Sequence, residues 1–185
     1  KRQALISFLC YIICWVQAAD EHYYFKNLSI QDGLSQTTVN AIIQDKKGFM
    51  WFGTKGGLNR YDGMLFRNFK HDMTDNHSLG NNFVTCLYQD NNGNIWVGTD
   101  AGVYIYYSDQ EIFIPFDRLS RENTKIERTV SAISGDKQGR VWIAVETQGL
   151  FCYEPQKDRL YNYTLHEFSA NVQSIAFDNL SLIHI

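Results

Sequence analysis

The sequence predicts an all-β protein: a β-propeller represented by about three and a half four-stranded blades of a larger ring, for which seven blades are expected. Three observations support this fold. Trp51, Trp96 and Trp142 recur 45 and then 46 residues apart within one repeated motif, and aromatic residues make up 15% of the chain. Glycine is frequent, with 13 residues, whereas only two prolines occur. Four strands in about 45 residues is the size of a propeller blade.

Each repeat contains the motif Asp-x-x-Gly-x-x-Trp. The stretch before each Asp is apolar on both alternating faces, as expected for an inner strand between neighbouring sheets. Helical repeats would show a period of 3.6 residues, which is absent. The motif positions, assigned a structural role, are Asp45, Gly48 and Trp51, then Asp90, Gly93 and Trp96, then Asp136, Gly139 and Trp142.

The motif predicts how the four strands of a blade are joined. The Asp carboxylate is expected to accept hydrogen bonds from backbone amides in a hairpin turn, and the Gly to adopt a positive φ. Two residues after the Trp come Gly53, Gly98 or Ala144, where we expect a neighbouring backbone to approach closely. A second turn leads to a third strand that ends on a Tyr. Aromatic pairs mark the outer strand: Phe66 and Phe69, Phe113 and Phe116, and Tyr161 and Tyr163.

The two ends of the chain differ from the repeats. Residues 1–19 read as a signal peptide, because a basic pair precedes an uncharged stretch and Ala18-Ala19 supply small residues for cleavage. The uncharged stretch is shorter than the roughly 20 residues of a membrane span, although an uncleaved anchor stays the alternative. Residues 20–185 are then an exported partial propeller. Its inner strands should start near residues 38, 83, 129 and 171, and its last blade looks truncated or degenerate.

Charge and composition exclude several kinds of partner and chemistry. The formal net charge of -3 gives no basic face for a phosphate backbone, so we expect no nucleic acid on this segment. The five histidines lack metal-ligand spacing, and no nucleophile elbow or phosphate-binding loop occurs. We therefore expect no metal, no cofactor and no catalytic residue. Cys86 and Cys152 occupy different repeat positions, which predicts two separate thiols.

Two kinds of residue are candidates for ligand contact. The tryptophans could stack on sugars, but their fixed offset favours a packing role in every blade. Polar residues on the turn after the Trp strand and on the connection into the next inner strand share one face of a propeller. These could hydrogen-bond a carbohydrate, although the alternative that they are only solvated turn residues stays open. They are Gln36, Lys55, Asn81, Asn82, Asp100, Arg128, Glu146 and Gln148.

The motif continues as Trp-x-Gly-Thr-x-x-Gly-Leu over residues 51–58. With its flanking segments, over about residues 24 to 178, this string resembles the two-component regulator propeller repeats of hybrid two-component system proteins (histidine kinase/response regulator) of Bacteroidetes. The third repeat departs from it, with Ala144-Val145 in place of Gly-Thr.

The resemblance implies a periplasmic sensor region whose parent is anchored in the inner membrane. Such a propeller would detect polysaccharide-derived oligosaccharides and signal to a histidine kinase that these residues do not contain. Its expected partners are an oligosaccharide, the remaining blades, the membrane and kinase modules, and a second parent subunit in a homodimer. The segment itself is not expected to be an enzyme. A secreted propeller enzyme or a carbohydrate-binding scaffold without kinase output is the alternative.

Overall fold

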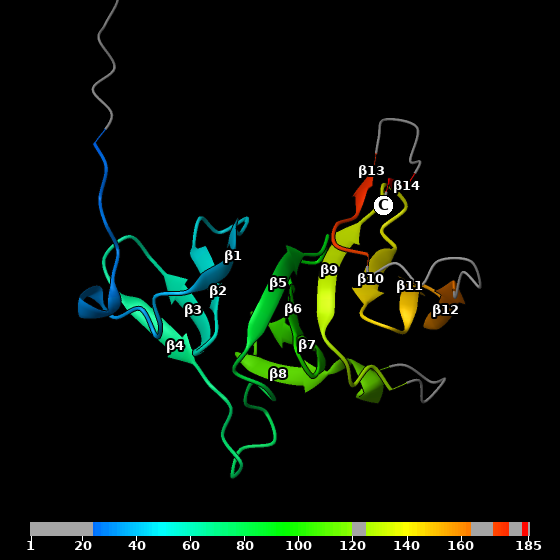
Figure 1. The fold of residues 1–185 in the computed structure, drawn as a ribbon, viewed down its shortest axis with the longest axis horizontal. Coiled ribbons are helices and arrows are strands. Elements are labelled where there is room, and N and C mark those ends of the chain that lie inside the picture. Colours follow the sequence, from blue (N-terminus) through cyan, green and yellow to red (C-terminus); the bar gives the residue numbers. More distant parts are fainter. Residues whose placement is uncertain (1–23, 120–124, 164–171, 178–182, 185) are drawn as a thin grey trace, which may run out of the picture.

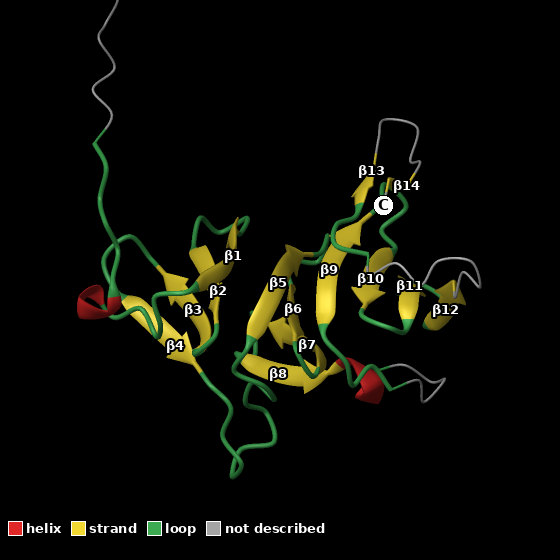
Figure 2. Cartoon of the chain, in the orientation of Figure 1, coloured by secondary structure: helices red, strands yellow, loops and turns green. Residues whose placement is uncertain are grey.

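The computed structural model describes residues 24–119, 125–163, 172–177 and 183–184. The proposed signal peptide and the inner-strand start expected near residue 171 lie outside these residues. The described chain is all-β, and its two helices are single 3-10 turns, η1 (Ile30–Asp32) and η2 (Phe116–Arg118) (Figure 2). Neither turn is long and apolar enough to cross a membrane.

Three antiparallel four-stranded sheets follow one another along the chain (Figure 1). In each sheet the strands pair in sequence order, so each sheet is one propeller blade. The prediction of an all-β propeller is therefore confirmed. Blade 1 contains β1 (Val39–Gln44), β2 (Met50–Thr54), β3 (Gly57–Tyr61) and β4 (Phe66–Phe69). Blade 2 contains β5 (Val84–Gln89), β6 (Ile95–Thr99), β7 (Gly102–Tyr107) and β8 (Ile112–Pro115). Blade 3 contains β9 (Val130–Gly135), β10 (Val141–Val145), β11 (Gly149–Glu154) and β12 (Arg159–Tyr163).

A further two-stranded sheet, β13 (Ala176–Phe177) with β14 (Ile183–His184), follows blade 3. Val172, Ile175 and Phe177 pack against the cluster of blade 3 that contains Trp142. The chain therefore begins a fourth layer on the same side of blade 3 that its Trp occupies.

The hydrophobic core lies between blades rather than inside one. Each blade presents its Trp on one face, and the next blade covers that face with its own opposite face. Trp51 of blade 1 packs with Leu87 and Val97 of blade 2, and Trp96 of blade 2 packs with Ile133 and Ile143 of blade 3. This stacking explains why the Trp must recur at one offset: each blade needs a large side chain to fill the wedge beside its neighbour.

Inner strands of adjacent blades are also joined by a repeated hydrogen bond. Asn40 Nδ2 donates to the Val84 carbonyl at 2.7 Å, and Thr85 Oγ1 donates to the Val130 carbonyl at 2.5 Å. Ser131 Oγ donates in the same way to the Val172 carbonyl. Each donor is the second residue of its inner strand, and each acceptor is the matching first position of the next blade. The bond satisfies a carbonyl where strands of different sheets meet without pairing.

The residue two positions after the Trp is small for a different reason than expected. A methyl group on Gly53 would lie 2.5 Å from Val84 Cγ1 of the next blade, and one on Gly98 would lie 3.0 Å from Val130 Cγ1 and clash with Cys86 Sγ. The close neighbours are thus side chains, not the backbone that we expected. The first valine of each inner strand fills the space that the glycine leaves.

One outer-strand expectation is wrong. Phe113 lies in β8, but that strand ends at Pro115, and Phe116 starts η2. The Phe116 ring lies 5.6 Å from the Trp96 ring and 5.1 Å from the Tyr153 ring. Packing between blades 2 and 3 thus takes Phe116 out of the strand and buries it.

Candidate functional site

The two ends of the blades are built differently. The Asp-turn end comprises the hairpin turns at residues 45–49, 90–94 and 136–140 together with the turns into the outer strands. The connection end comprises the turns at residues 55–56, 100–101 and 146–148 together with the connections that enter β1, β5 and β9. All eight candidate ligand residues belong to the connection end.

At the Asp-turn end, one carboxylate organises each turn. Asp45 Oδ1 accepts from the backbone N–H groups of Lys47 and Phe49, both at 2.9 Å, and Asp45 Oδ2 accepts from Trp51 Nε1 at 2.8 Å. Gly48, inside the turn, has a φ of 91°. The second and third blades repeat these bonds, with indole distances of 3.0 Å from Trp96 to Asp90 and 2.9 Å from Trp142 to Asp136.

The bond to the indole was not part of the sequence prediction, which gave the Asp only backbone partners. The sequence contained a pattern that could have predicted this bond, because Asp and Trp recur six residues apart in all three repeats. A buried indole N–H requires an acceptor, and the turn carboxylate provides one. The Asp and Trp of each motif thus act as one structural unit.

Blade 3 adds a cation to this unit. Arg140 Nε donates to Asp136 Oδ2 at 2.6 Å, and the guanidinium lies over the Trp142 ring at 5.3 Å. Burial would raise the pKa of Asp136, but hydrogen bonds from Trp142 and Arg140 outweigh it and hold that pKa below its usual value. The carboxylate is therefore ionised and fully paired at neutral pH.

At the connection end, the turn after the Trp strand lies against the connection of the same blade. The Asp100 N–H donates to the Phe83 carbonyl at 3.2 Å, and the Glu146 N–H donates to the Thr129 carbonyl at 2.9 Å. In blade 1 a methyl group on Gly56 would lie 2.9 Å from Gln36 Cβ. The turn and connection residues that we selected are therefore neighbours in space within each blade.

Threonine fixes the frame of this turn in the first two blades. Thr54 Oγ1 donates to the Gly57 carbonyl and accepts from the Gly56 N–H. Thr99 makes the matching bonds to Gly102 and Ala101. In blade 3 Val145 stands at this position, and the longer turn is closed instead by the Gln148 N–H on the Val145 carbonyl.

A cation–π contact joins the connection ends of blades 1 and 2. Lys55, on the turn of blade 1, places Nζ 5.3 Å from the centre of the Phe83 ring, at the entrance to β5. Phe83 is half-buried and was not among the predicted residues. The sequence could have indicated this residue, because Phe83 is aromatic at a repeat position where blades 1 and 3 carry Thr38 and Thr129.

The other candidates differ in how free their side chains are. Asn81 Oδ1 accepts from the Phe83 N–H and Asn82 Oδ1 accepts from the His71 N–H, both at 2.7 Å. These two side-chain oxygens therefore stabilise the backbone of the connection between β4 and β5. Asp100 and Arg128 are exposed. Gln148 Oε1 is buried and has no hydrogen-bond partner among the described residues.

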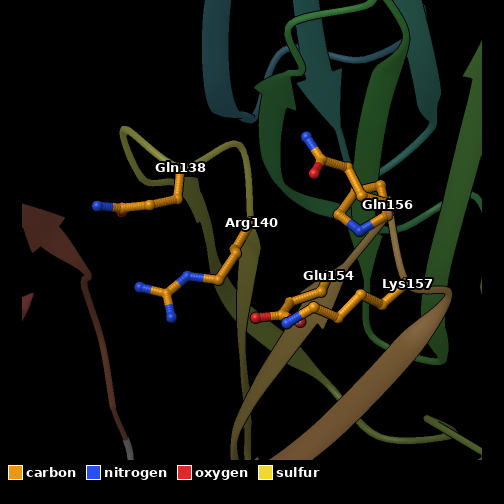
Figure 3. A pocket seen from close by; sticks show the side chains of 6 residues that line it. Gln138, Arg140, Glu154, Gln156 and Lys157 are labelled. Carbon is orange, nitrogen blue, oxygen red and sulfur yellow. Dashed lines mark ion pairs between the residues drawn. The ribbon is translucent and has the colours of Figure 1, made fainter.

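A hollow of about 350 Å³ lies elsewhere, at the Asp-turn end of blade 3 (Figure 3). In it, Glu154 and Lys157 lie side by side and form an ion pair of 2.9 Å, whereas Gln138 and Arg140 extend from the neighbouring hairpin. Arg140 forms an ion pair with Asp136, and Lys157 forms one with Glu154, so the charges of both cations in this hollow are neutralised. None of the eight candidate ligand residues lines it.

Cys86 and Cys152 both pack among apolar side chains. Burial raises the pKa of Cys86 to about 12 and that of Cys152 to about 11, so both are unreactive thiols at neutral pH. Both are free, and no disulfide joins them. No group of three or more His, Cys, Asp or Glu among these residues is placed to hold a metal ion.

The fold and the repeated Asp and Trp units define a β-propeller of the class built from Asp-x-x-Gly-x-x-Trp blades. Two segments, residues 33–56 and 78–101, match the family described as two component regulator propeller. These are the connections and first two strands of blades 1 and 2. Segments of blades 1 and 2 are therefore similar to two component regulator propeller repeats.

The relatives with similar sequences include a histidine kinase and an extracellular domain. A histidine kinase of Formosa agariphila is 39% identical over 75 residues, which is 40% of this chain and 5% of that protein. The extracellular domain of a Bacteroides thetaiotaomicron protein described as a hybrid two component system is 28% identical, with a TM-score of 0.67. That match covers 75% of this chain and 20% of the solved one, so this chain spans only a small part of both relatives.

A solved virginiamycin B lyase of Staphylococcus aureus shares the fold at 13% identity, with a TM-score of 0.63 over 85% of this chain and 50% of the enzyme. This similarity concerns the fold alone. The matched repeats and the extracellular relative together show that the chain is similar to the propeller regions of two-component regulators.

Proposed function

We propose that this chain is the exported, ligand-sensing part of a hybrid two-component sensor, and that its connection end binds an oligosaccharide released from a polysaccharide. The bound propeller would signal to a histidine kinase elsewhere in the parent protein, which we expect to be a membrane-anchored homodimer on the periplasmic side. The chain itself would perform no catalysis. The observation that carries this proposal is the 28% identity to an extracellular two-component domain over three quarters of the chain.

The connection end supports ligand binding by the way its residues vary on a fixed frame. Corresponding turns carry Lys55 in blade 1, Asp100 in blade 2 and Glu146 in blade 3. The backbone of these turns is held by the threonine and connection bonds described above, so a change of side chain leaves the frame in place. Loops on a rigid scaffold are where binding residues concentrate. Sugars present hydroxyl groups that charged and amide side chains can bind.

Phe83 gives the connection end an apolar surface among these polar groups. The Phe83 ring lies beside Lys55, and the Phe83 backbone carbonyl accepts from the Asp100 N–H. An aromatic ring flanked by hydrogen-bonding groups suits a sugar, which has an apolar face and polar edges. This combination favours a carbohydrate over a purely ionic ligand.

Signalling requires the ligand to favour one of two arrangements of the sensor. The blades contact one another through large apolar faces and through the hydrogen bonds from Asn40, Thr85 and Ser131. A ligand that bridges the connection ends of adjacent blades would shift the packing between blades or between subunits. That shift would then pass to the kinase.

The proposal is tested by titrating the purified exported region of the parent with a panel of oligosaccharides by calorimetry. For an oligosaccharide that binds, Lys55→Ala should weaken binding about tenfold or more, the effect of about 1.4 kcal/mol. Lys47→Ala is the matched control: the same residue type in the same blade, but at the Asp-turn end. Equal loss in both variants, or no binding by any oligosaccharide in the panel, would refute this assignment.

The kinase output needs a separate measurement. Autophosphorylation of the full-length parent should change when the binding oligosaccharide is added, and Lys55→Ala should shift this response to higher ligand concentrations. A binding oligosaccharide that leaves autophosphorylation unchanged would favour the scaffold alternative.

A further inference from the structure

The outer strand of blade 2 ends earlier than those of blades 1 and 3. At the connection end, Leu58 of blade 1 and Leu150 of blade 3 each pair with their outer strand. In blade 2 the pairing stops at Tyr104 and Pro115, one residue short of the matching Val103. The chain then turns directly into η2 (Figure 2). A space therefore opens beside Val103 at the connection end of blade 2.

This space is a pocket of about 290 Å³. Its walls are β7 with the turn before it, the end of β8 with η2, and the connection that enters β9. A methyl group on Gly102 would clash with the Ile126 carbonyl oxygen, so this connection lies directly against the start of β7. The pocket therefore belongs to the connection end, although none of the eight predicted ligand residues lines it.

Tyr104 gives the pocket an aromatic wall. The matching residues Asn59 of blade 1 and Phe151 of blade 3 are 0% and 1% exposed, whereas Tyr104 is only half-buried. A methyl group on Gly80, in the connection that enters β5, would clash with the Tyr104 ring and hydroxyl. The ring therefore packs directly on the Gly80 backbone, which holds it in position.

Two charged side chains of the pocket are available to a ligand. Asp117 and Arg118 are exposed, and neither side chain has a hydrogen bond or an ion pair with another residue that the structure describes. Burial first, and then the nearby Asp117 carboxylate, raise the pKa of the Tyr104 phenol, which is therefore a protonated donor at neutral pH. The hollow of blade 3 differs in this respect, because its two cations are already paired.

The charges at the pocket balance, which favours a neutral ligand. Asp117 and Arg118 carry opposite charges, and Glu127 forms an ion pair of 3.4 Å with Lys125. A hydroxyl group can donate to a carboxylate or accept from a guanidinium, and an aromatic ring can contact the apolar face of a sugar. Ligand pockets commonly have about 300 to 1,000 Å³. A volume at the lower end of this range suits a single sugar ring better than a chain of rings.

We propose that this pocket binds one neutral sugar ring, with Tyr104 against the apolar face of the ring, Asp117 accepting from one hydroxyl group and Arg118 donating to another. The early end of β8 creates the pocket, so the site belongs to blade 2 and is not repeated in blades 1 and 3. The inference rests on the proposed function, because it takes this ring to be one unit of the oligosaccharide bound at the connection end. It adds three residues that select a neutral unit over an acidic or a basic one.

The test is amide hydrogen exchange on the complete exported region of the parent, titrated separately with glucose, galactose, mannose and xylose. At least one of these sugars should slow exchange at residues 117–119 and 125–127 in a concentration-dependent way. Asp117→Asn should raise the sugar concentration for half-maximal protection about tenfold or more, since a hydrogen bond to a charged group is lost. Asp109→Asn is the matched control: the same change in the same blade, at a side chain that is 95% exposed at the Asp-turn end. It should leave that concentration within about twofold.

Two results would overturn the pocket assignment: no protection of these residues by any of the four sugars, or an equal shift in Asp117→Asn and Asp109→Asn. Protection that is weakened only by Asp117→Asn supports it. The proposed function is judged separately, by the calorimetric titration with oligosaccharides. An oligosaccharide that binds through Lys55 but leaves residues 117–119 and 125–127 unprotected would refute the pocket alone. Protection by a single sugar, with no oligosaccharide bound, would support the pocket and refute the proposed function.

Discussion

The two ends of the blades follow opposite rules. At the Asp-turn end, three turns repeat the same carboxylate, the same glycine and the same bond to a buried indole, with Trp distances of 2.8, 3.0 and 2.9 Å. At the connection end, the backbone contacts recur but the outward side chains change from Lys55 to Asp100 to Glu146. Repetition without change is what packing requires, whereas variation on a constant frame is what recognition can use. We therefore expect the Asp-turn end to determine the stability of the molecule and the connection end to determine which ligand it binds.

The largest effect is expected at the Asp-turn end. Asp90→Ala removes the Oδ1 atom that accepts from two backbone N–H groups and leaves the indole N–H of Trp96 without its partner. Leaving buried donors unsatisfied costs about 1 to 3 kcal/mol, so we expect about 3 kcal/mol less stability by urea unfolding. Asp109→Ala is the control, because the Asp109 side chain is 95% exposed and should cost under about 0.5 kcal/mol. Similar losses in the two variants would mean that the turn carboxylate has no special role.

An intermediate effect is expected where blades meet. Gly98→Ala would place a methyl group against Cys86 Sγ of its own blade and 3.0 Å from Val130 Cγ1 of blade 3. Overpacking of this kind costs about 1 to 3 kcal/mol. Blade 3 pairs Ala144 with Ala132 across the same two strands, so Cys86→Ala should recover part of the loss caused by Gly98→Ala.

A double-mutant cycle of thermal unfolding measures this recovery. Additive effects of Gly98→Ala and Cys86→Ala would show that Val130, rather than Cys86, sets the limit on size at this position.

The smallest effect is the contribution of Asp136 in blade 3 to the pH dependence of stability. Hydrogen bonds from Trp142 and Arg140 hold the pKa of Asp136 below its usual value near 3.8, although burial acts the other way. A carboxylate with a lowered folded-state pKa contributes stability that is complete above its unfolded pKa and is lost as the pH falls through its folded pKa. Arg140→Gln removes one of these donors, so it should reduce the loss of stability between pH 5 and pH 2.5. Unfolding free energies at both pH values measure this, and an unchanged difference would show that Arg140 does not affect the titration of Asp136.

The sequence predicted most of the fold because the repeat itself carries the information. Asp45, Gly48 and Trp51 recur at fixed offsets, so the turn and the strand order follow from three copies of one pattern. The sequence could not predict that Phe116 leaves its strand, since this depends on a space between Trp96 and Tyr153 that exists only after two blades pack. Sequence reasoning also predicted a neighbouring backbone beside Gly98, where the structure has the side chains of Cys86 and Val130. The repeat spacing indicates that a small residue is required at this position but not which atoms pack against it.

For the candidate site, sequence reasoning placed the polar candidates at one end of the blades but missed two features. Phe83 escaped notice because an aromatic residue at one repeat position looks like another packing residue until its half exposure is known. The hydrogen bonds from Asn40, Thr85 and Ser131 were missed because three different side chains share one task. A pattern of identical residues cannot reveal them, whereas a search for small polar residues at one offset could.

The division of roles between the two ends is tested most directly by an exchange footprint of the exported region with and without a binding oligosaccharide. We expect slower amide exchange at residues 35–38, 55–57, 81–83, 100–102 and 146–149, with residues 45–49, 90–94 and 136–140 unchanged. Protection centred on the Asp turns, with the connection end unaffected, would contradict the account and move the binding site to the opposite end of the propeller.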